Sequence, residues 1–346
     1  MNFRILLLTI IPLFINCLSI CTAQSRGDIR VMFYNTENTF DTEDDPATSD
    51  DDFTPTGKQH WTIKKYNQKL NHLYQAIAAV GMWQPPEIIG LCEVENRKVV
   101  SDLLYQTPLS KYRYSIVHFD SPDLRGIDVT LLYRSDKAKV LNQHPVHVEF
   151  IDNPQKKTRD ILFVQLLMTT GDTICIFVNH WPSRRGGELE SEPLRIEVAA
   201  ILRHSVDSLF RLNSRMKIIV MGDFNDDPTN FSIAHTLNAK ADATAPSGNQ
   251  LYNLSIDLMR TSKIGTHYFQ GHWQVIDQMI VSGGLLIPLS GLSVSPENAH
   301  ICSEDFLLQT DKRNIGRKPF PTYSGPRYIG GYSDHLPVYL DLFLKR

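Results

Sequence analysis

The chain has 346 residues, of which 42% are hydrophobic and 21% are charged. This composition supports one large core or at most two domains, and the absence of any periodic tract excludes repeat, coiled-coil and low-complexity architectures. The formal net charge of -3 excludes a strongly basic footprint for nucleic acid. Any polyanion must therefore be bound by local basic patches, and the candidates are residues 156–159, 184–185 and 312–318.

The first 23 residues have the pattern of a secretory signal peptide. Arg4 supplies the positive region, Ile5 to Ile15 is almost wholly apolar, and Cys21-Thr22-Ala23 offers a small-residue cleavage site. We therefore expect residues 1–23 to be removed. The mature chain, residues 24–346, is expected to be exported to the periplasm or the extracellular space.

A lipid anchor at Cys17 or Cys21 is the weaker alternative, because Asn16 and Ile20 stand where a lipoprotein signal has a small residue. No later segment of the sequence has the length and apolar character of a membrane span. The cysteines of the mature chain are odd in number and sparse, so neither a disulfide framework nor a zinc motif is predicted.

The first part of the mature chain predicts a strand, a loop, a helix and a second strand. Residues 29–35 are rich in β-formers, residues 61–80 have one apolar helical face, and residues 87–92 are a short apolar run. The acidic residues between 41 and 52 lack the glycine and the terminal glutamate of an EF-hand. We interpret them as a solvated loop rather than a calcium site.

The rest of the chain continues to alternate strands with helices, which is typical of a layered α/β fold. A hairpin is predicted around Gly171-Asp172, and a long helix runs from Ser191, as N-cap, to Phe210. No shift in composition divides the chain, so we expect one domain over residues 24–346. The other strands are predicted at residues 112–117, 127–133, 161–168, 173–178, 216–221, 275–281 and 336–344.

Several of these apolar strands adjoin a polar residue that can bind metal or phosphate. Strand ends converge in α/β folds, so such residues gather in one site. Magnesium-assisted phosphoester chemistry needs these groups, because Mg²⁺ prefers oxygen ligands and a carboxylate can take a proton from water. The residues are Asn35, Glu37, Glu93, Asn179, His180, Asp223, Asn225, Asp277, Asp334 and His335.

Each of these residues alone has a simpler explanation. Asn35 and Asp334 are ordinary turn formers, and His180 is also typical of a half-buried core histidine. The repetition of such residues at six strand ends in one chain is what favours a site.

The segments that carry these residues resemble the motifs of the endonuclease/exonuclease/phosphatase superfamily, the DNase-I-like hydrolases, and especially its exported bacterial members. The resemblance implies a four-layer α/β sandwich, in which two packed mixed β-sheets are flanked by helices. Six motifs occur in family order, at residues 33–41, 90–96, 178–183, 221–226, 273–277 and 332–338.

The resemblance also implies a divalent-metal site. Glu93 and Asp334 would hold Mg²⁺ or Mn²⁺, with Asn35 and Glu37 close by. Glu37 replaces the aspartate that some nuclease members carry, which alters its reach to the metal.

The same pattern implies a set of catalytic roles. Asp223 would orient or deprotonate the attacking water, and Asn225 would help to position it and the phosphate. His335, oriented by Asp277, would stabilise charge on the phosphoryl oxygens, because a carboxylate favours the imidazolium form. His180 would contact the phosphate or assist the leaving group.

Two glycine-containing turns beside the motifs supply candidates for substrate contacts. Arg125 and Asp128 belong to the first turn, and Arg184 and Arg185 belong to the second. Arginine suits bidentate binding of phosphate. The alternative for each arginine is a solvated surface turn.

The leading functional hypothesis is metal-dependent hydrolysis of a phosphodiester, with nucleic acid as the expected substrate. The alternative is a phosphatase, or a phosphodiesterase of phospholipids or inositol phosphates, with the same fold. A binding protein that has lost catalysis is disfavoured, because every catalytic motif position holds competent chemistry. No obligate protein partner is implied.

Overall fold

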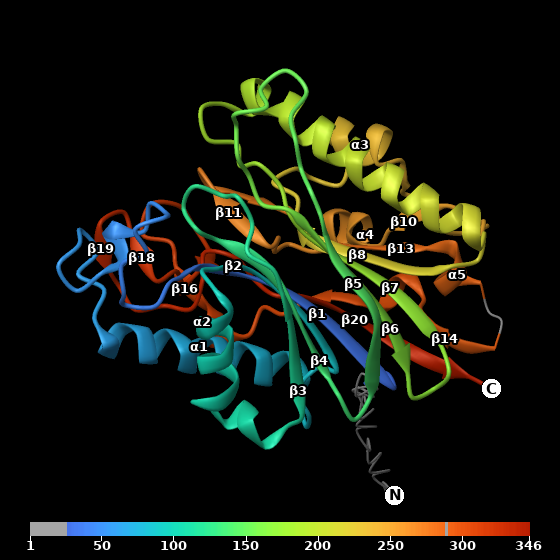
Figure 1. Cartoon of the computed structure of the whole chain (residues 1–346), viewed down its shortest axis with the longest axis horizontal. Coiled ribbons are helices and arrows are strands. Elements are labelled where there is room, and N and C mark those ends of the chain that lie inside the picture. The colour runs from blue at the N-terminus through green and yellow to red at the C-terminus, as the bar shows by residue number, and fades with distance from the viewer. Residues whose placement is uncertain (1–25, 288–289) are drawn as a thin grey trace, which may run out of the picture.

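The computed structural model describes residues 26–287 and 290–346 of the chain (Figure 1). The predicted signal peptide, residues 1–23, lies outside the described residues. In the part of the chain that the structure describes, no helix has the length and apolar character needed to cross a membrane.

Seven strands form the first β-sheet: β1 (Ile29–Thr39), β2 (Ile88–Val94), β3 (Tyr114–His118), β4 (Asp128–Arg134), β14 (Gly291–Ser293), β15 (Ala299–Ile301) and β20 (Val338–Lys345). Their order is β14-β20-β1-β2-β4-β3, and β15 also pairs with β20. The sheet is mixed, because β1 and β2 run parallel while the other pairs are antiparallel.

The second sheet also has seven strands: β5 (Ala138–Val146), β6 (Ile161–Met168), β7 (Thr173–His180), β8 (Lys217–Asp223), β9 (Ala239–Lys240), β10 (Leu251–Asn253) and β13 (Asp277–Ser282). Their order is β5-β6-β7-β8-β13-β10-β9. This sheet is mixed as well, since the β7–β8 and β9–β10 pairs are parallel.

Helices cover the outer faces of the two sheets, as Figure 1 shows. α1 (Ile63–Gly81) and α2 (Arg97–Tyr105) pack on the first sheet, and α3 (Glu188–Leu212) packs on the second. The inner faces of the sheets pack on each other through a core to which both contribute. The expected four-layer α/β sandwich with two mixed sheets is therefore confirmed.

Strand β1 shows how its sequence suits burial on both faces. Val31 and Phe33 belong to the core between the sheets, whereas Met32 and Tyr34 pack with the helices on the other side. Since side chains alternate between the faces of a strand, a strand covered on both faces is expected to be mostly apolar, and a polar residue within it needs a buried partner. Polar residues are therefore expected at the ends of such strands.

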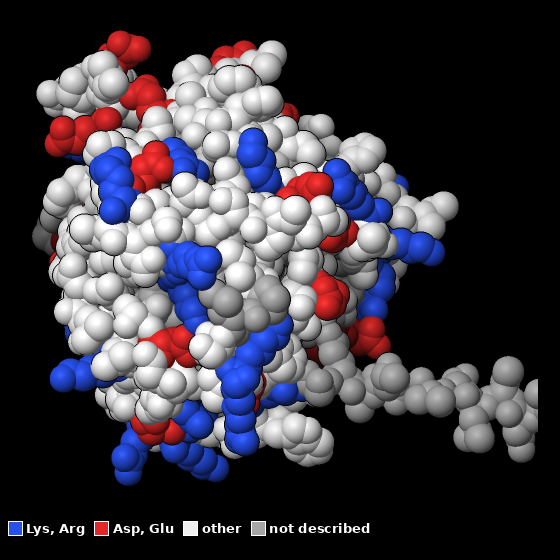
Figure 2. All heavy atoms as spheres, turned by 90° about the vertical axis from the view of Figure 1, so that its right-hand side faces the viewer, with Lys and Arg blue, Asp and Glu red and all other residues white. Residues whose placement is uncertain are grey.

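Short hairpins gather at the end of the sandwich toward which β1 and β2 run, and the C-terminus lies at the opposite end (Figure 1). Figure 2 shows that opposite end, where Lys and Arg are interspersed with Asp and Glu. The shorter elements are α4 (Ser255–Thr261), α5 (Gly283–Leu286), β11 (His267–Phe269), β12 (His272–Gln274), β16 (Leu308–Thr310), β17 (Arg317–Pro319), β18 (Tyr323–Ser324), β19 (Arg327–Tyr328), and the helical turns Asp51–Phe53, Pro108–Lys111, Ser232–Thr236, Pro296–Asn298 and Asp305–Leu307.

Some local details differ from the sequence-based prediction. α3 begins at Glu188, so Ser191 is not its N-cap; the Ser191 hydroxyl instead donates to the carbonyl of Gly187 at 2.6 Å, inside the first turn. α2 and β5 were not predicted. β5 is exposed over much of its length, so it lacks the apolar run that marks the inner strands.

A buried ion pair ties the first and last strands together. The Arg30 guanidinium in β1 donates to both carboxylate oxygens of Asp341 in β20, at 2.8 and 2.6 Å, and also to the carbonyl of Val80 in α1. Both charged side chains are 2% exposed. A buried charge that loses its partner is strongly destabilising, even where the intact pair adds little.

We predict that Asp341→Ala lowers the free energy of unfolding by about 3–5 kcal/mol, because it leaves the Arg30 guanidinium buried without its carboxylate. Urea denaturation followed by circular dichroism measures the change. Asp305→Ala is the matched control, because it removes an aspartate from an exposed pair with Arg317 and should leave stability unchanged. Equal losses of unfolding free energy in the two variants would show that the buried pair stabilises the protein no more than the exposed pair.

Candidate active site

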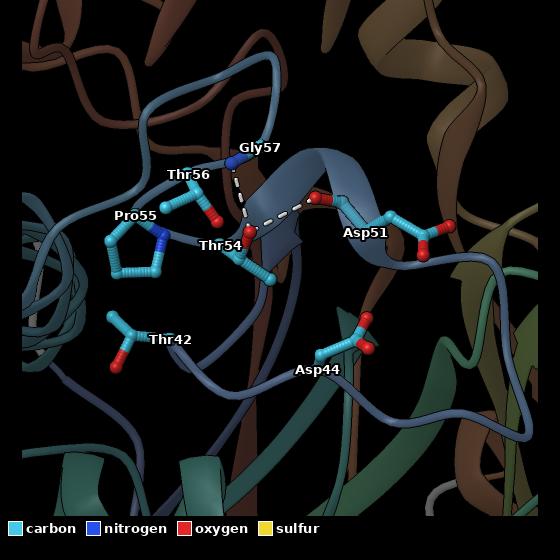
Figure 3. A pocket seen from close by; sticks show the side chains of 7 residues that line it. All are labelled: Thr42, Asp44, Asp51, Thr54, Pro55, Thr56 and Gly57. Carbon is cyan, nitrogen blue, oxygen red and sulfur yellow. Dashed lines mark hydrogen bonds between the residues drawn. The ribbon is translucent and has the colours of Figure 1, made fainter.

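The acidic loop between β1 and α1 forms a surface pocket of its own, shown in Figure 3. This pocket has a volume of about 600 Å³ and is lined by Thr42, Asp44, Asp51, Thr54, Pro55, Thr56 and Gly57. Within residues 26–287 and 290–346, the groups of acidic, histidine and cysteine side chains close enough to share a metal ion do not include Asp44 or Asp51. The interpretation of this segment as a solvated loop stays a prediction.

The register of the two sheets brings the predicted strand-end residues to one end of the sandwich. In the first sheet, Asn35 is the last residue of β1 in regular register with β2, and it pairs with the residue before Glu93. In the second sheet, Asp223 pairs with His180 on one side and with Asp277 on the other. Each sheet therefore contributes one group of polar side chains at this end.

Direct contacts join the two groups across the sandwich. Asn35 Nδ2 donates to Asp223 Oδ2 at 2.9 Å. His180 Nε2 lies 3.7 Å from both Glu93 Oε1 and Asp223 Oδ2, and His335 Nε2 lies 3.9 Å from the same Asp223 oxygen. The buried Asp223 carboxylate is thus the centre of the cluster.

Four of the eight non-glycine residues with a positive φ in the described part of the chain lie at or beside this site. Positive φ angles occur at Glu37 (51°), Asn38 (50°), Glu93 (58°) and Asn225 (52°), where a residue with a side chain loses on the order of 1 kcal/mol or more. Hydrogen bonds hold these conformations: Asn38 N donates to Glu93 Oε2 at 2.8 Å, and Asn225 N donates to Asp223 Oδ1 at 2.9 Å. Strain that the surroundings maintain is typical of functional sites.

His335 is held as an imidazolium. Its Nδ1–H donates to Asp277 Oδ2 at 2.7 Å, and both side chains are almost fully buried. Burial alone lowers the pKa of His335, but the charges of Asp277 and Asp223 outweigh it and hold this pKa well above its usual value. The ring therefore presents a positively charged Nε2–H to the cluster.

His180 is held in the opposite charge state. Burial, and after it the charges of Arg159 and Arg125, lower the pKa of His180 well below its usual value. The carboxylates of Glu93 and Asp223 favour the charged form, but at 3.7 Å they do not hydrogen-bond to the ring, and burial dominates. A neutral ring can accept or donate a hydrogen bond.

The carboxylates of the cluster suit a divalent cation. Burial, and after it the charge of Asp334, raises the pKa of Glu37 to about 7. Burial also raises the pKa of Asp223 to about 7, with a further contribution from Asp277, although His335 opposes the shift. Such a concentration of acidic oxygens fits a hard ion such as Mg²⁺ or Mn²⁺. The Glu93 and Asp334 side chains, 14% and 48% exposed, are the carboxylates open to a ligand.

Glu37 is oriented in a way that the sequence did not predict. Its Oε2 accepts from Thr322 N at 2.6 Å and lies 3.9 Å from Lys69 Nζ. Lys69, 2% exposed, also donates to Thr322 Oγ1 at 2.6 Å and to Tyr332 O at 2.7 Å. Glu37 thus anchors the segment before β18, and its place beside a metal stays a prediction.

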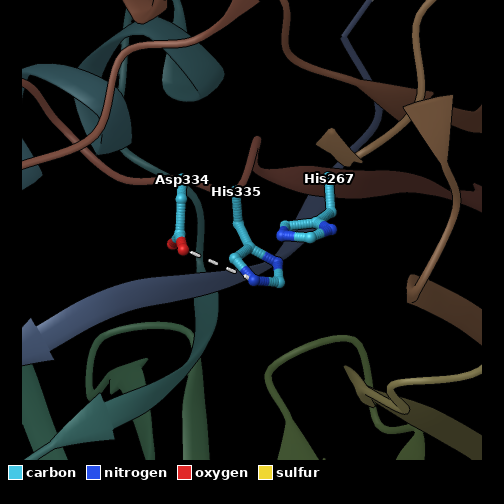
Figure 4. Close-up of side chains that lie close together, drawn as sticks. All are labelled: His267, Asp334 and His335. Carbon is cyan, nitrogen blue, oxygen red and sulfur yellow. Dashed lines mark ion pairs between the residues drawn. The ribbon is translucent and has the colours of Figure 1, made fainter. Parts of the chain in front are cut away.

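His267 was not predicted from the sequence, yet it lies beside His335, as Figure 4 shows. The two rings are 4.7 Å apart between centroids, and the two residues form an isolated β-bridge. His267, Asp334 and His335 each offer a ligand atom within 4.8 Å of the others. The local sequence around His267 has no feature that separates it from an ordinary surface histidine.

The first candidate turn places its two residues in different surroundings. Arg125 is 43% exposed, and its Nε lies 3.6 Å from Asp123 Oδ1. Asp128 is buried, and its Oδ2 lies 3.0 Å from His118 Nε2. Arg125 can therefore reach a substrate, whereas the Asp128 carboxylate is engaged inside the protein.

The two arginines of the second candidate turn also differ in their surroundings. Arg184 Nε donates to Asn225 O at 2.7 Å, and its Nη2 lies 3.5 Å from Asp226 Oδ1 and 3.6 Å from Asp227 Oδ2. Arg184 therefore holds the loop that carries Asn225. Arg185 is exposed and remains available to a substrate.

Arg159, predicted to belong to a basic surface patch, is instead buried. It donates to His180 O at 3.2 Å and to Trp181 O at 2.6 Å, and it pairs with Asp123 Oδ2 at 3.0 Å. Arg159 thus fixes the end of β7. A free backbone carbonyl at a strand end attracts a cation, but no signal in the local sequence shows which arginine will turn inward.

Comparison with known proteins identifies one family. The family model described as "Endonuclease/Exonuclease/phosphatase family" matches residues 30–344. No curated protein matches the chain.

Solved structures share the fold at low sequence identity. The human nocturnin catalytic domain with bound sulfate has a TM-score of 0.55 and 18% identity, over 92% of this chain and 93% of that chain. D. rerio TDP2 complexed with a single-strand DNA product has a TM-score of 0.53 and 12% identity, over 91% of this chain and 98% of that chain. A mannosyl-6-phosphatase of Bacteroides thetaiotaomicron VPI-5482 has a TM-score of 0.51 and 15% identity, over 91% of this chain and 99% of that chain. The predicted DNase-I-like sandwich is confirmed by these likenesses.

We predict that Asp277→Asn lowers the pKa of His335, because the carboxylate that favours the imidazolium is lost while the shape is kept. The wild-type ring then stays charged at neutral pH, whereas the variant ring loses its proton at lower pH. Titration of the imidazole by NMR in the presence of a chelator measures the difference. Asp128→Asn, which alters the other buried Asp–His pair, should leave the His335 titration unchanged. An unshifted His335 in the Asp277 variant would contradict the assignment.

Proposed function

The chain belongs to the endonuclease/exonuclease/phosphatase family, and on that premise we propose that it is a divalent-metal-dependent phosphodiesterase that cleaves nucleic acid outside the cytoplasm. The observation that carries the proposal is the buried cluster of Asp223, His180 and His335, with interatomic distances of 3.7 and 3.9 Å. It combines a carboxylate that titrates near neutral pH with one neutral and one charged imidazole. Phosphoester hydrolysis needs a proton acceptor and fixed positive charge in this proximity.

Glu93 and Asp334 are the residues that would hold the cation. Asn35 pairs with the residue before Glu93, and its carbonyl accepts from the hydroxyl of Ser333, the residue before Asp334. When bound, Mg²⁺ or Mn²⁺ offsets the charge of the phosphate and stabilises its oxygens in the transition state. Glu93 is well placed for this role because its backbone has a left-handed conformation and its Oε2 accepts a hydrogen bond from the N–H of Asn38, which orients the side chain.

Asp223 takes the proton of the attacking water, for which its pKa of about 7 is suited at neutral pH. Asn225 positions that water and the phosphate, with its Nδ2 fixed on Trp181 O at 3.0 Å. His335 donates its Nε2–H to a phosphoryl oxygen, and Asp277 keeps the ring charged and oriented. His180, as a neutral ring, contacts the phosphate or assists the leaving group.

Nucleic acid is the substrate that we favour. The motifs resemble those of exported bacterial nucleases, TDP2 has been solved with a single-strand DNA product, and Arg125 and Arg185 are exposed at the two candidate turns. The pattern of residues 1–23 supports export. The net charge of -3 and the mannosyl-6-phosphatase neighbour favour the second candidate, a phosphatase of small phosphate esters.

We predict that hydrolysis requires a divalent cation and that Glu93→Gln lowers kcat/KM by roughly 100-fold or more, because the amide keeps the shape but loses the charge that binds the metal. Assays with Mg²⁺ or Mn²⁺, and with a chelator, measure both effects. Glu95→Gln is the matched control, since Glu95 is a buried glutamate two residues away that bonds to Asp41 N. Full activity in chelator, or in the Glu93 variant at ordinary metal concentration, would refute the metal role.

We predict cleavage of DNA or RNA when the mature protein is incubated with a substrate panel and Mg²⁺ or Mn²⁺. The panel holds duplex and single-stranded nucleic acid, phospholipids, inositol phosphates and sugar phosphates, and electrophoresis and phosphate release report the products. Release of phosphate or head group from a small substrate, with no cleavage of any nucleic acid, would contradict the nuclease proposal and favour the second candidate, a phosphatase of small phosphate esters.

A further inference from the structure

A basic pocket lies beside the end of β7, outside the cluster already described. It has a volume of about 410 Å³ and lies between the β5–β6 connection and the segment that leads into α3. These two segments rise side by side at the top of Figure 1. The residues that line the pocket are Lys156, Lys157, Thr158, Arg159, Pro182, Ser183, Arg185, Glu190, Ser191 and Leu194.

Positive charge dominates this pocket. Lys156, Lys157 and Arg185 are exposed, and no side-chain hydrogen bond or ion pair is recorded for them among the described residues. Glu190 is the single carboxylate in the lining, and the charge of Arg159 is matched by Asp123 outside it. Three cations against one anion make the pocket attractive to a negatively charged ligand.

An unsatisfied hydroxyl belongs to the same wall. Thr158 is 3% exposed, and its Oγ1 has no hydrogen-bond partner among the described residues. Buried hydroxyls are nearly always paired, so an unpaired one between two basic residues needs an explanation. A phosphate oxygen is an acceptor of the right kind for a hydroxyl, but this Oγ1 has almost no exposed surface, so Lys156, Lys157 and Arg185 are the groups that reach a ligand.

The pocket is tied rigidly to the catalytic cluster. Arg159 lines the pocket and also donates to the carbonyl of His180, so one side chain connects the two places. Next to it, Asp160 accepts from Val148 N at 3.0 Å and contacts His147 Nδ1 at 2.8 Å, which closes the base of the β5–β6 connection. The lysines therefore adjoin an anchored segment, and binding needs little additional ordering.

We propose that this pocket binds a second phosphate group of the substrate while the first lies at Asp223 and His335. The proposal rests on the proposed function, and it narrows the substrate to molecules with at least two phosphates, among which we favour a nucleotide chain. A single phosphate ester fills only the catalytic cluster. The pocket thus favours substrates with several phosphates, such as oligonucleotides, although the net charge of the whole chain is negative.

The test is the binding of a fluorescein-labelled oligothymidylate of twelve nucleotides in chelator, where the metal-dependent reaction is stopped. We expect the double variant Lys156→Ala, Lys157→Ala to bind about tenfold more weakly than the wild type, because charge-assisted bonds to phosphate are lost. The slope of log Kd against log salt should also fall by about 0.7 for each phosphate contact removed from the single strand. Fluorescence anisotropy across a salt series gives both values.

The matched control is the double variant Lys139→Ala, Lys345→Ala, which removes the same charge at the other end of the sandwich. Both lysines are exposed. Lys139 pairs with Leu167 near the end of β6, and Lys345 pairs with Gly291 at the start of β14, so both lie at the strand ends away from His180. The control should keep the wild-type affinity and salt slope. Hydrolysis of bis(p-nitrophenyl) phosphate, a diester with one phosphate, should be equal in all three proteins.

The outcomes separate the pocket from the proposed function. If the wild type cleaves the oligonucleotide and the Lys156, Lys157 double variant binds it as tightly as the wild type does, the pocket proposal is wrong and the proposed function is unaffected. A wild type that neither binds nor cleaves the oligonucleotide overturns both. Loss of bis(p-nitrophenyl) phosphate hydrolysis in the double variant also overturns the pocket, because the lysines would then act at the catalytic cluster itself.

Discussion

The hydrogen bond between His335 and Asp277 joins the two sheets of the sandwich. Asp277 begins β13 in the second sheet, and His335 shortly precedes β20 in the first, with 2.7 Å between Nδ1 and Oδ2. The bond from Asn35 to Asp223 crosses the same boundary at 2.9 Å. The distances within the site are therefore set by how the sheets pack, and the apolar core between them is as much a part of the site as its polar residues.

Burial on both faces also explains why the polar groups occur where they do. A carboxylate in the middle of β7 or β8 would be removed from water with no partner, which costs several kcal/mol or more. The strand ends are the positions where such groups can meet one another and still reach solvent. Left-handed backbone at Glu93 and Asn225 redirects the chain there, and hydrogen bonds from neighbouring N–H groups keep it in place.

The sequence predicted those features that depend on short-range patterns. The inner strands are apolar runs, and their polar end residues are adjacent in the sequence, so both could be identified before the structure. Lys69 could not, because its partners Thr322 and Tyr332 lie 253 and 263 residues away. His267 lies at the site because of its bridge to His335, which the sequence does not show. Arg159 was assigned to a surface patch because it follows Lys156 and Lys157 in a run of basic residues.

The pairing of the first strand with the last has a consequence for how the protein is made. Arg30 and Asp341 are 311 residues apart, and Asp334 and His335 lie close to β20 at the end of the chain. Contacts between such distant residues form late, since a long loop must close first. A chain made only as far as the residues before Asp334 can bury much of its core, yet it lacks the strand that completes the first sheet and two of the proposed active-site residues. Enzymatic activity would then appear only once β20 has joined the first sheet, which makes activity a direct readout of the folding of the whole sandwich.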